Sequence, residues 1–254
     1  MTVRLSNICY FWGCKTFQTG IIHKNLFIML ILISVVFMVI GFIISGVLKS
    51  KFRKYSQVPL SNGMSGAEVA AAMLKYNQIY DVKIIHVEGQ LTDHYNPQDK
   101  TVNLSEDVYH GRSVAAAAVA AHECGHAVQH ATAYSYLQMR SSLVPVVNIA
   151  ASLQQYLFLA GIAGIGMFNS PILLIIALAA FGITTLFSLV TLPVEFDASK
   201  RALAWLDGSN FARGTEYDGA KDALTWAAMT YVSAALAALV QFVYLLWMLL
   251  GSRD

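Results

Sequence analysis

Four long apolar stretches divide the chain, and each is long enough to cross a lipid bilayer. They comprise residues 26–48, 143–168, 172–192 and 227–250. A helix needs about 20 predominantly apolar residues to span the hydrocarbon core. The second stretch is interrupted by Asn148, Gln154 and Gln155, and polar groups at that depth usually face other helices. The pattern therefore predicts about four transmembrane helices, with a buried core helix as the alternative for the second.

The polar region after the first apolar stretch has the pattern of a small α+β unit. Ser65 and Glu68 form a capping box that predicts a helix running to about residue 78. Residues 82–87 and 101–104 have the composition of strands. A turn at residues 96–99 precedes the second of these strands.

An alanine-rich run, residues 113–121, ends in the motif HECGH at residues 122–126. Residues four apart lie on one face of a helix, so the imidazoles of His122 and His126 can reach the same metal ion. Glu123 points to a different side, where it can polarise a water without ligating the ion. A helix as apolar as this alanine-rich run is expected to be buried on most sides. Polar groups buried in it then need partners. The sequence therefore predicts a zinc site with His122 and His126 as ligands and Glu123 as the general base.

A catalytic zinc site of this type requires a third protein ligand. His130 continues the spacing of four, but three such positions span about 12 Å along the helix axis, so His130 is expected beside the site or at the surface. The later glutamates are Glu195 and Glu216. Glu216 lies in a glycine-flanked loop, whereas Glu195 follows Pro193 at the expected start of a helix and shares a face with Ser199. Glu195 is the expected third ligand, and the fourth position stays open for water.

The segments HECGHAVQH at residues 122–130 and PVEFDASKRA at residues 193–202 resemble the YugP-type neutral zinc metallopeptidases. These are membrane proteins related in pattern to the HtpX-like gluzincins. The resemblance covers most of the chain from about residue 51, including residues 95–105 ahead of the motif. Together with the residue pattern it implies a mainly α membrane protein, with about four transmembrane helices and a small α+β zincin-like catalytic unit that holds one zinc ion.

The second polar region departs from the wider gluzincin pattern at one position. In that pattern an aspartate four residues after the ligand glutamate orients a ligand histidine. Here Ser199 stands at that position, and Asp197 lies two residues earlier. Asp197 either takes over the orienting role, if the helix begins loosely, or stabilises the helix N-terminus by its charge. The pattern leaves these alternatives open.

Composition and charge indicate the compartment. With 56% hydrophobic and 13% charged residues, the chain is too apolar for one ordinary soluble domain. Two predicted crossings separate the polar regions at residues 49–140 and 193–226, which together carry 13 of the 17 Lys and Arg residues. Positive charge favours the cytoplasmic side, so both regions are expected in the cytoplasm and both termini outside. The net charge of +2 gives no indication of nucleic-acid binding.

These residues predict a zinc metalloendopeptidase of the cell membrane that acts on membrane-associated or misfolded proteins. Two partners are expected. One is a polypeptide substrate that is itself a membrane protein, and the other is the lipid bilayer. Zinc lowers the pKa of water and polarises the scissile carbonyl, while Glu123 takes the proton and returns it to the leaving amine. The alternatives are a membrane scaffold or adaptor that retains zinc without turnover, and packing of these residues without metal. A glutamate beside two ligands is superfluous in a structural site, which favours the enzyme.

Residues 1–25 form a tail that does not match a signal peptide. It carries Cys9 and Cys14, and is either a short external tail, closed by a disulfide under oxidising conditions, or the product of an over-extended start codon. Cys124 is expected to be a small buried residue.

Two further hypotheses concern the binding of substrate. The strand at residues 101–104 either offers its edge to a substrate backbone or is an ordinary sheet strand. The candidates for stabilising the oxyanion are His94, Tyr95, Tyr109 and His110.

Overall fold

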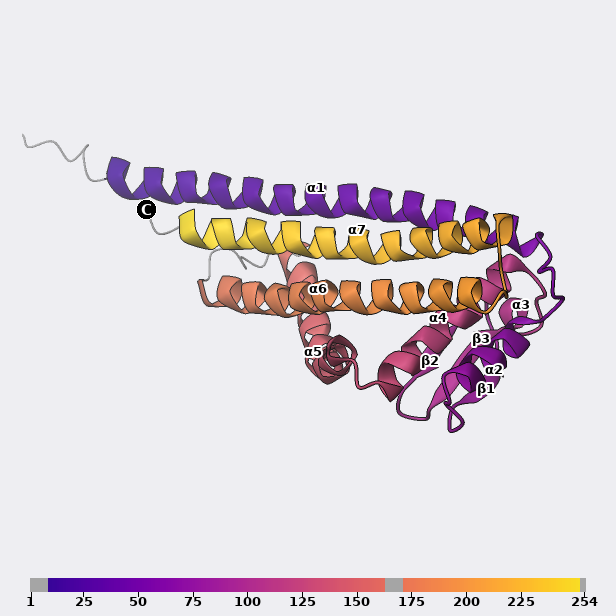
Figure 1. Cartoon of the computed structure of the whole chain (residues 1–254). Helices are drawn as coiled ribbons and strands as arrows, with labels where there is room; N and C mark the ends of the chain where they lie inside the picture. The colour runs from indigo at the N-terminus through magenta and orange to yellow at the C-terminus, as the bar shows by residue number, and fades with distance from the viewer. Residues whose placement is uncertain (1–8, 163–170, 252–254) are drawn as a thin grey trace, which may run out of the picture. The chain divides into compact units, whose positions relative to one another are not determined.

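The computed structural model describes residues 9–162 and 171–251, which are mainly helical with one small sheet (Figure 1). The elements are α1 (Cys9–Ser56), α2 (Gly66–Tyr76), β1 (Lys83–Val87), β2 (His94–Asn96), β3 (Thr101–Ser105), α3 (Glu106–Tyr109), α4 (Val114–Ala131), α5 (Ser135–Ile162), α6 (Pro171–Gly208) and α7 (Thr215–Gly251). The chain divides into two compact units. The first comprises Met1–Val39, Pro145–Leu186 and Leu236–Asp254, and the second comprises Ile40–Val144 and Phe187–Ala235.

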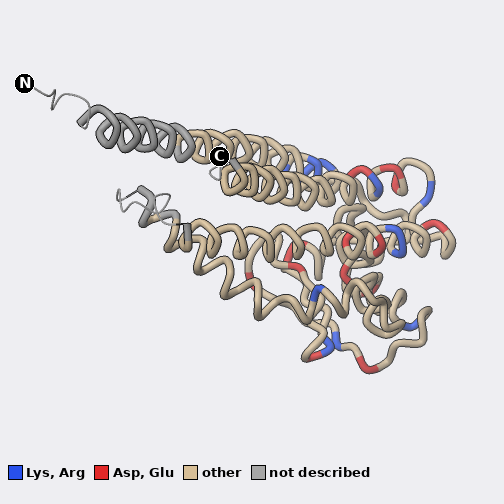
Figure 2. Tube along the Cα trace, turned by 90° about the vertical axis from the view of Figure 1, so that its left-hand side faces the viewer, with Lys and Arg blue, Asp and Glu red and all other residues tan. Residues whose placement is uncertain are grey.

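Three helices of the described residues are long and apolar enough to cross a membrane. Their spans are Ile28–Ser56, Ile172–Gly208 and Thr215–Leu250. Long parts of these helices carry no Lys, Arg, Asp or Glu, as the tan stretches in Figure 2 show. The spans contain the predicted third and fourth transmembrane helices, and the first except for residues 26–27. Helix α5, which contains most of the predicted second one, is not among them, and residues 163–168 of that prediction lie outside the described residues.

Polar side chains of the first unit pair between its helices. Gln154 of α5 donates a hydrogen bond to Thr184 Oγ1 of α6 at 2.8 Å. Gln241 of α7 donates to Ser34 Oγ of α1 at 3.1 Å. Unpaired polar groups are costly at membrane depth, so these bonds account for amides within apolar stretches.

The second unit is built around α4, which carries the HECGH motif. Ser113 caps the helix, because its hydroxyl accepts a hydrogen bond from the amide of Ala116. The small residues that follow are almost all buried, in a core that α2, α3, β3 and the end of α6 share. The predicted capping box of Ser65 and Glu68 is present at the start of α2, and α2 ends at Tyr76, just before the predicted residue 78.

The sheet has the order β1-β3-β2, with β1 parallel and β2 antiparallel to β3. The strands predicted at residues 82–87 and 101–104 correspond to β1 and β3, whereas β2 was not predicted. Strand β3 is central, and all five of its residues are buried. Because β1 pairs with all of β3 and β2 with residues 101–103, β3 is not an edge strand, and that hypothesis is wrong. The edges belong to β1 and β2.

Three predicted boundaries differ from the structure. Helix α6 is continuous, with Pro193 in its interior, so no helix begins ahead of Glu195. Such a proline is tolerated in membrane helices because neighbouring groups re-satisfy the freed carbonyl. Glu216 lies in the first turn of α7 instead of a loop. Helix α1 begins at Cys9, within the predicted tail; the side chains of Cys9 and Cys14, and hence their predicted disulfide, lie outside the described part.

Candidate metal centre

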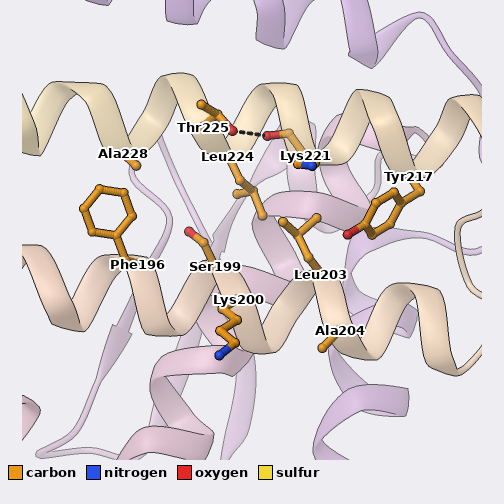
Figure 3. Close-up of a pocket in the computed structure, with 10 residues that line it drawn as sticks. All are labelled: Phe196, Ser199, Lys200, Leu203, Ala204, Tyr217, Lys221, Leu224, Thr225 and Ala228. Atoms are coloured by element: carbon orange, nitrogen blue, oxygen red, sulfur yellow. Dashed lines mark hydrogen bonds between the residues drawn. The ribbon is translucent and has the colours of Figure 1, made fainter.

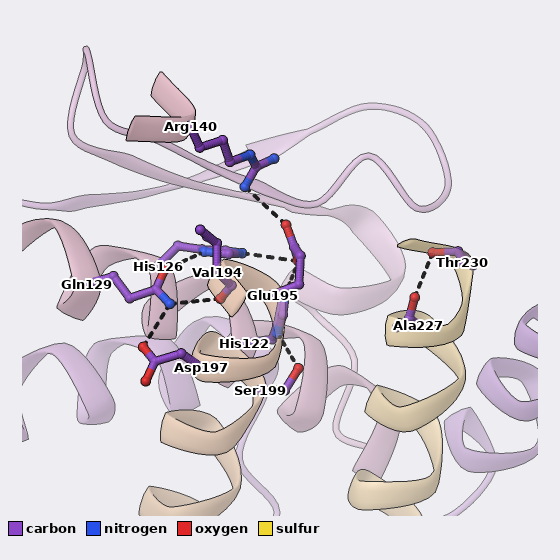
Figure 4. A network of polar contacts seen from close by, with 10 residues as sticks. All are labelled: His122, His126, Gln129, Arg140, Val194, Glu195, Asp197, Ser199, Ala227 and Thr230. Carbon is purple, nitrogen blue, oxygen red and sulfur yellow. Dashed lines mark hydrogen bonds and ion pairs between the residues drawn. The ribbon is translucent and has the colours of Figure 1, made fainter. Parts of the chain in front are cut away.

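The structure brings His122, His126 and Glu195 together in the interior of the second unit (Figure 4). The side chains of His126 and Glu195 are buried and that of His122 is 12% exposed, and one ligand atom from each lies within 4.8 Å of the others. Glu195 Oε2 lies 3.3 Å from Nε2 of His122 and 3.6 Å from Nε2 of His126. The three residues predicted as ligands therefore form one compact group.

Gly125 allows α4 and α6 to approach this closely. A Cβ atom at position 125 would lie 2.6 Å from the carbonyl oxygen of Ala198 in α6. Any other residue would push the two helices apart. The glycine inside the motif thus sets the distance between the helix with the imidazoles and the helix with Glu195.

His126 is held by a chain of polar groups that runs through the buried side chain of Gln129 (Figure 4). Its Nδ1–H donates to Gln129 Oε1 at 3.0 Å. The amide nitrogen of Gln129 donates to Asp197 Oδ2 at 2.9 Å and to the carbonyl oxygen of Val194 at 2.8 Å. These two acceptors fix the orientation of the amide, so its oxygen faces the ring. His126 therefore keeps the lone pair of Nε2 free for a metal ion.

Asp197 and Ser199, two residues of α6, are linked by hydrogen bonds to different imidazoles of the motif. Ser199 Oγ lies 3.1 Å from Nδ1 of His122. Asp197 reaches His126 through Gln129. Because α6 begins far ahead of Asp197, this carboxylate is not at a helix N-terminus, and its interpretation as a dipole partner is wrong.

The geometry of this group fits a metal ion. Glu195 Oε2 is one of two buried side-chain atoms without a hydrogen-bond partner among the described residues. A buried carboxylate oxygen without a partner is costly, and a cation held between it and two imidazole nitrogens would satisfy it. The other oxygen, Oε1, accepts a hydrogen bond from Arg140 Nη1 at 3.0 Å. Two imidazoles and one carboxylate are a ligand set of catalytic zinc.

Glu123 lies beside this group, in the wall of a cavity of about 230 Å³ that also reaches His126, Arg140 and Glu195. Only 8% of Glu123 is exposed. Burial alone would lower the pKa of His126, but its contact with the carboxylate of Glu195 and the charge of Glu123 outweigh burial and raise it. A proton therefore competes for the nitrogen that a metal ion would take.

The oxyanion candidates fall into two pairs. His94 and Tyr95 line the cavity with Glu123. The rings of Tyr109 and His110 contact each other and that of His86 instead, and neither is part of the lining. Sequence spacing could not separate the pairs, because β2 was not recognised as a strand.

Four polar residues of this cavity were not predicted from the sequence: Asp93, Arg140, Ser141 and Tyr231. Arg140 ends the polar region at residues 49–140, where the sequence shows only its positive charge. Asp93 accepts hydrogen bonds from the amide and hydroxyl of Ser105. Burial raises the pKa of Asp93 against the lowering effect of these bonds, and the charge of Glu123 raises it further. Only tertiary packing connects these residues to the motif.

His130 and Glu216 lie outside the metal-ligand group. The Nδ1 atom of His130 is 2.7 Å from the hydroxyl of Tyr95. Burial and the charge of Asp81 raise the pKa of Tyr95 to about 12, so the phenol stays protonated. Glu216 accepts hydrogen bonds from the amide and hydroxyl of Ser61.

Cys124 is fully buried, as predicted, and its Sγ lies 3.6 Å from the carbonyl oxygen of Ala70. Burial raises the pKa of its thiol. It packs as a small core residue between the two histidines of the motif.

A larger cavity of about 350 Å³ lies between α6 and α7 (Figure 3). Its wall includes Phe196, Lys200 and Lys221, but none of the three ligand candidates and not Glu123. Cavity volume alone would therefore select a cavity without the ligand candidates. The smaller cavity at Glu123 is the candidate site.

The model of the family described as "Putative neutral zinc metallopeptidase" matches residues 29–250. The chain belongs to this family. It is also 44% identical over 206 residues to "Putative membrane protease YugP" of Bacillus subtilis (strain 168), across 81% of this chain and 90% of that relative. No solved structure matches the chain. The family match confirms the resemblance inferred from the motif, and its zinc requirement agrees with the donor set at His122, His126 and Glu195.

Proposed function

We propose that this member of the neutral zinc metallopeptidase family is a membrane-bound endopeptidase with one zinc ion. His122, His126 and Glu195 hold the ion, and Glu123 is the general base. The observation that carries the proposal is the buried Oε2 atom of Glu195, which lacks a hydrogen-bond partner and faces both imidazole Nε2 atoms. Zinc bound there supplies a Lewis acid that lowers the pKa of water to about 7 and polarises the scissile carbonyl.

The residues around this group hold and move protons. Glu123 takes a proton from the attacking water and returns it to the leaving amine. Gln129 and Ser199 hold the imidazoles through Nδ1, which leaves both Nε2 atoms for the metal. Arg140 neutralises the second oxygen of Glu195. His94 and Tyr95 stay candidates for stabilising the oxyanion, and Tyr231 of the same cavity joins them.

The site is proposed on the cytoplasmic side of the cell membrane. Glu195 lies beside His122, so both must be on the same side of the membrane. The chain between α4 and Glu195 must therefore cross the membrane an even number of times. The apolar part of α6 supplies one crossing, and the predicted span at residues 143–168 supplies the other. The positive residues at the end of α1 favour the cytoplasm. The substrates are then membrane-associated or misfolded proteins that expose a segment at that surface.

A protease assay tests the activity. The full-length protein is purified in detergent and incubated with casein and with a membrane-protein substrate. We expect cleavage that a chelator abolishes and added zinc restores. A protein that retains zinc without cleaving either substrate would instead be the scaffold or adaptor.

Labelling with an impermeant thiol reagent tests the side of the membrane. Exposed Gln98 and Asp207 are each replaced by cysteine, and Ser170 serves as the position between the second and third predicted spans. Gln98→Cys and Asp207→Cys should react only after permeabilisation, and Ser170→Cys in intact cells. The opposite pattern would put the site outside the cell. The background for all three lacks Cys9, Cys14 and Cys124.

A further inference from the structure

Two cavities meet at the proposed general base. The cavity of about 230 Å³ and a second one of about 180 Å³ share Asp93, Glu123 and Tyr231 in their walls. The two imidazoles are divided between them, since His126 lines the first and His122 the second. The junction of the cavities therefore coincides with the place where the chemistry is proposed.

The walls of the two cavities differ in character. The first, the polar lobe, holds the ion pair of Arg140 and Glu195, with His94 and Ser141, beside the apolar side chains of Pro97, Leu137 and Val144. The second, the apolar lobe, is lined mainly by aliphatic and aromatic side chains of α1, α4 and α7. These are Leu48, Phe52, Val119, Ala223, Leu224 and Ala227.

Thr230 adds little polarity to the apolar lobe. It lines the lobe, but its hydroxyl donates to the carbonyl oxygen of Ala227 at 2.6 Å (Figure 4). Away from Asp93, His122, Glu123 and Tyr231, the lobe offers a charged side chain no partner to replace the water that it would lose. An apolar side chain would gain from being removed from water.

We propose that the apolar lobe binds an apolar side chain directly next to the scissile bond, and that the polar lobe receives the chain on the other side. The inference rests on the proposed function. A general base must lie within hydrogen-bond reach of the water that it deprotonates, so the scissile carbonyl belongs at the junction beside Glu123. The residues on either side of that bond then extend into the two lobes. The substrates are polypeptides cleaved beside a large apolar residue.

Profiling of cleavage sites tests this assignment. The full-length protein with zinc is given a peptide library that varies both positions flanking the bond, and products are identified by mass spectrometry. Each methylene group in an apolar pocket changes kcat/KM by about 10- to 200-fold. We expect Leu, Met or Phe to exceed Ala by at least about tenfold on one side of the bond, with charged residues disfavoured there.

Two variants change the size of the lobe in opposite directions. Ala227→Phe should shift the preference from Leu or Phe towards Ala by about tenfold or more, while peptides with Ala are still cleaved. Leu48→Ala should widen the preference to larger aromatic residues. Ala234→Phe, the same change at an exposed position of α7, should leave the profile unchanged.

Binding of labelled peptides to the Glu123→Gln protein provides a readout without turnover. It should follow the same apolar preference, and Ala227→Phe should weaken binding of Leu and Phe peptides. If the wild type cleaves but shows no apolar preference, or both lobe variants keep its profile, the inference is overturned and the proposed function stands. If the wild type does not cleave, the proposed function fails. Peptide binding that is indifferent to the apolar residue overturns the pocket in either case.

Discussion

The two helices that carry the ligand candidates are anchored in different ways. Helix α4 has 18 residues, is capped by Ser113, and is buried over most of its length. Helix α6 has 38 residues, begins in an apolar stretch, and passes Pro193 before it reaches the site. Packing in a core fixes the imidazoles, whereas Glu195 lies on the continuation of a helix that is apolar enough to cross a membrane. The close contact at Gly125 joins the two, so metal geometry depends on how the membrane helix is held against the core.

Removal of either imidazole should have the largest effect. His122→Ala and His126→Ala each leave two ligands from different helices, and bound zinc should fall to a small fraction of the wild-type content. His130→Ala removes the next histidine of α4 and should leave zinc bound. Metal analysis of the three purified variants gives the zinc content per chain. Comparable zinc loss in His130→Ala would move the site along α4.

Glu123→Gln should separate chemistry from binding. The amide cannot accept a proton from water, so kcat/KM should fall by about 10²- to 10⁴-fold, while zinc content stays at the wild-type level. The matched control is Glu216→Gln, at a carboxylate that contacts Ser61 instead of the site. Loss of zinc from Glu123→Gln would mean that this carboxylate is a ligand and not the base.

The supports of the two imidazoles should differ in strength. Gln129→Leu removes a fully buried amide that links His126 to Asp197 and should weaken zinc binding by about 10- to 100-fold. Ser199→Ala removes one hydroxyl that is only partly buried, and its effect should be near the lower end, about tenfold. Competition with a chelating dye gives both zinc affinities. Equal losses would show that the chain through Gln129 has no special role.

Gly125→Ala tests the contact between the helices, and its effect on zinc binding should be indirect. The added methyl group meets the backbone of Ala198, and overpacking of this kind costs about 1–3 kcal/mol. The denaturation midpoint and the zinc affinity should both fall. Gly46→Ala is the matched control, because nothing lies within 4 Å of its added Cβ in α1, and it should not lower the midpoint. An unchanged midpoint in Gly125→Ala would show that the helices do not need this close contact.

Local periodicity explains which parts of the site could be predicted. The spacing of His122 and His126 is a property of any helix, and few glutamates were left to compete with Glu195. Gln129 was also within reach of such reasoning, because it lies three residues from His126 on the same face. Arg140 and Tyr231 were not, since only tertiary packing brings them to the cavity.

The errors in the fold have similar causes. Strand β2 was missed because its three residues, His94–Asn96, are too few to show an alternating pattern. That omission made β3 appear to be an edge. Pro193 was interpreted as a helix start, as is usual in soluble proteins, whereas α6 continues through it.

The zinc content of the full-length wild type, compared with that of Glu195→Ala, tests most directly whether α4 and α6 bind one metal ion together. Both proteins are purified in detergent without chelator, and metal is measured per chain by mass spectrometry, with Glu216→Ala as the matched control. We expect one zinc ion per chain in the wild type and in Glu216→Ala, and strong depletion in Glu195→Ala. A full zinc complement in Glu195→Ala, or a wild type that binds none, would contradict this expectation.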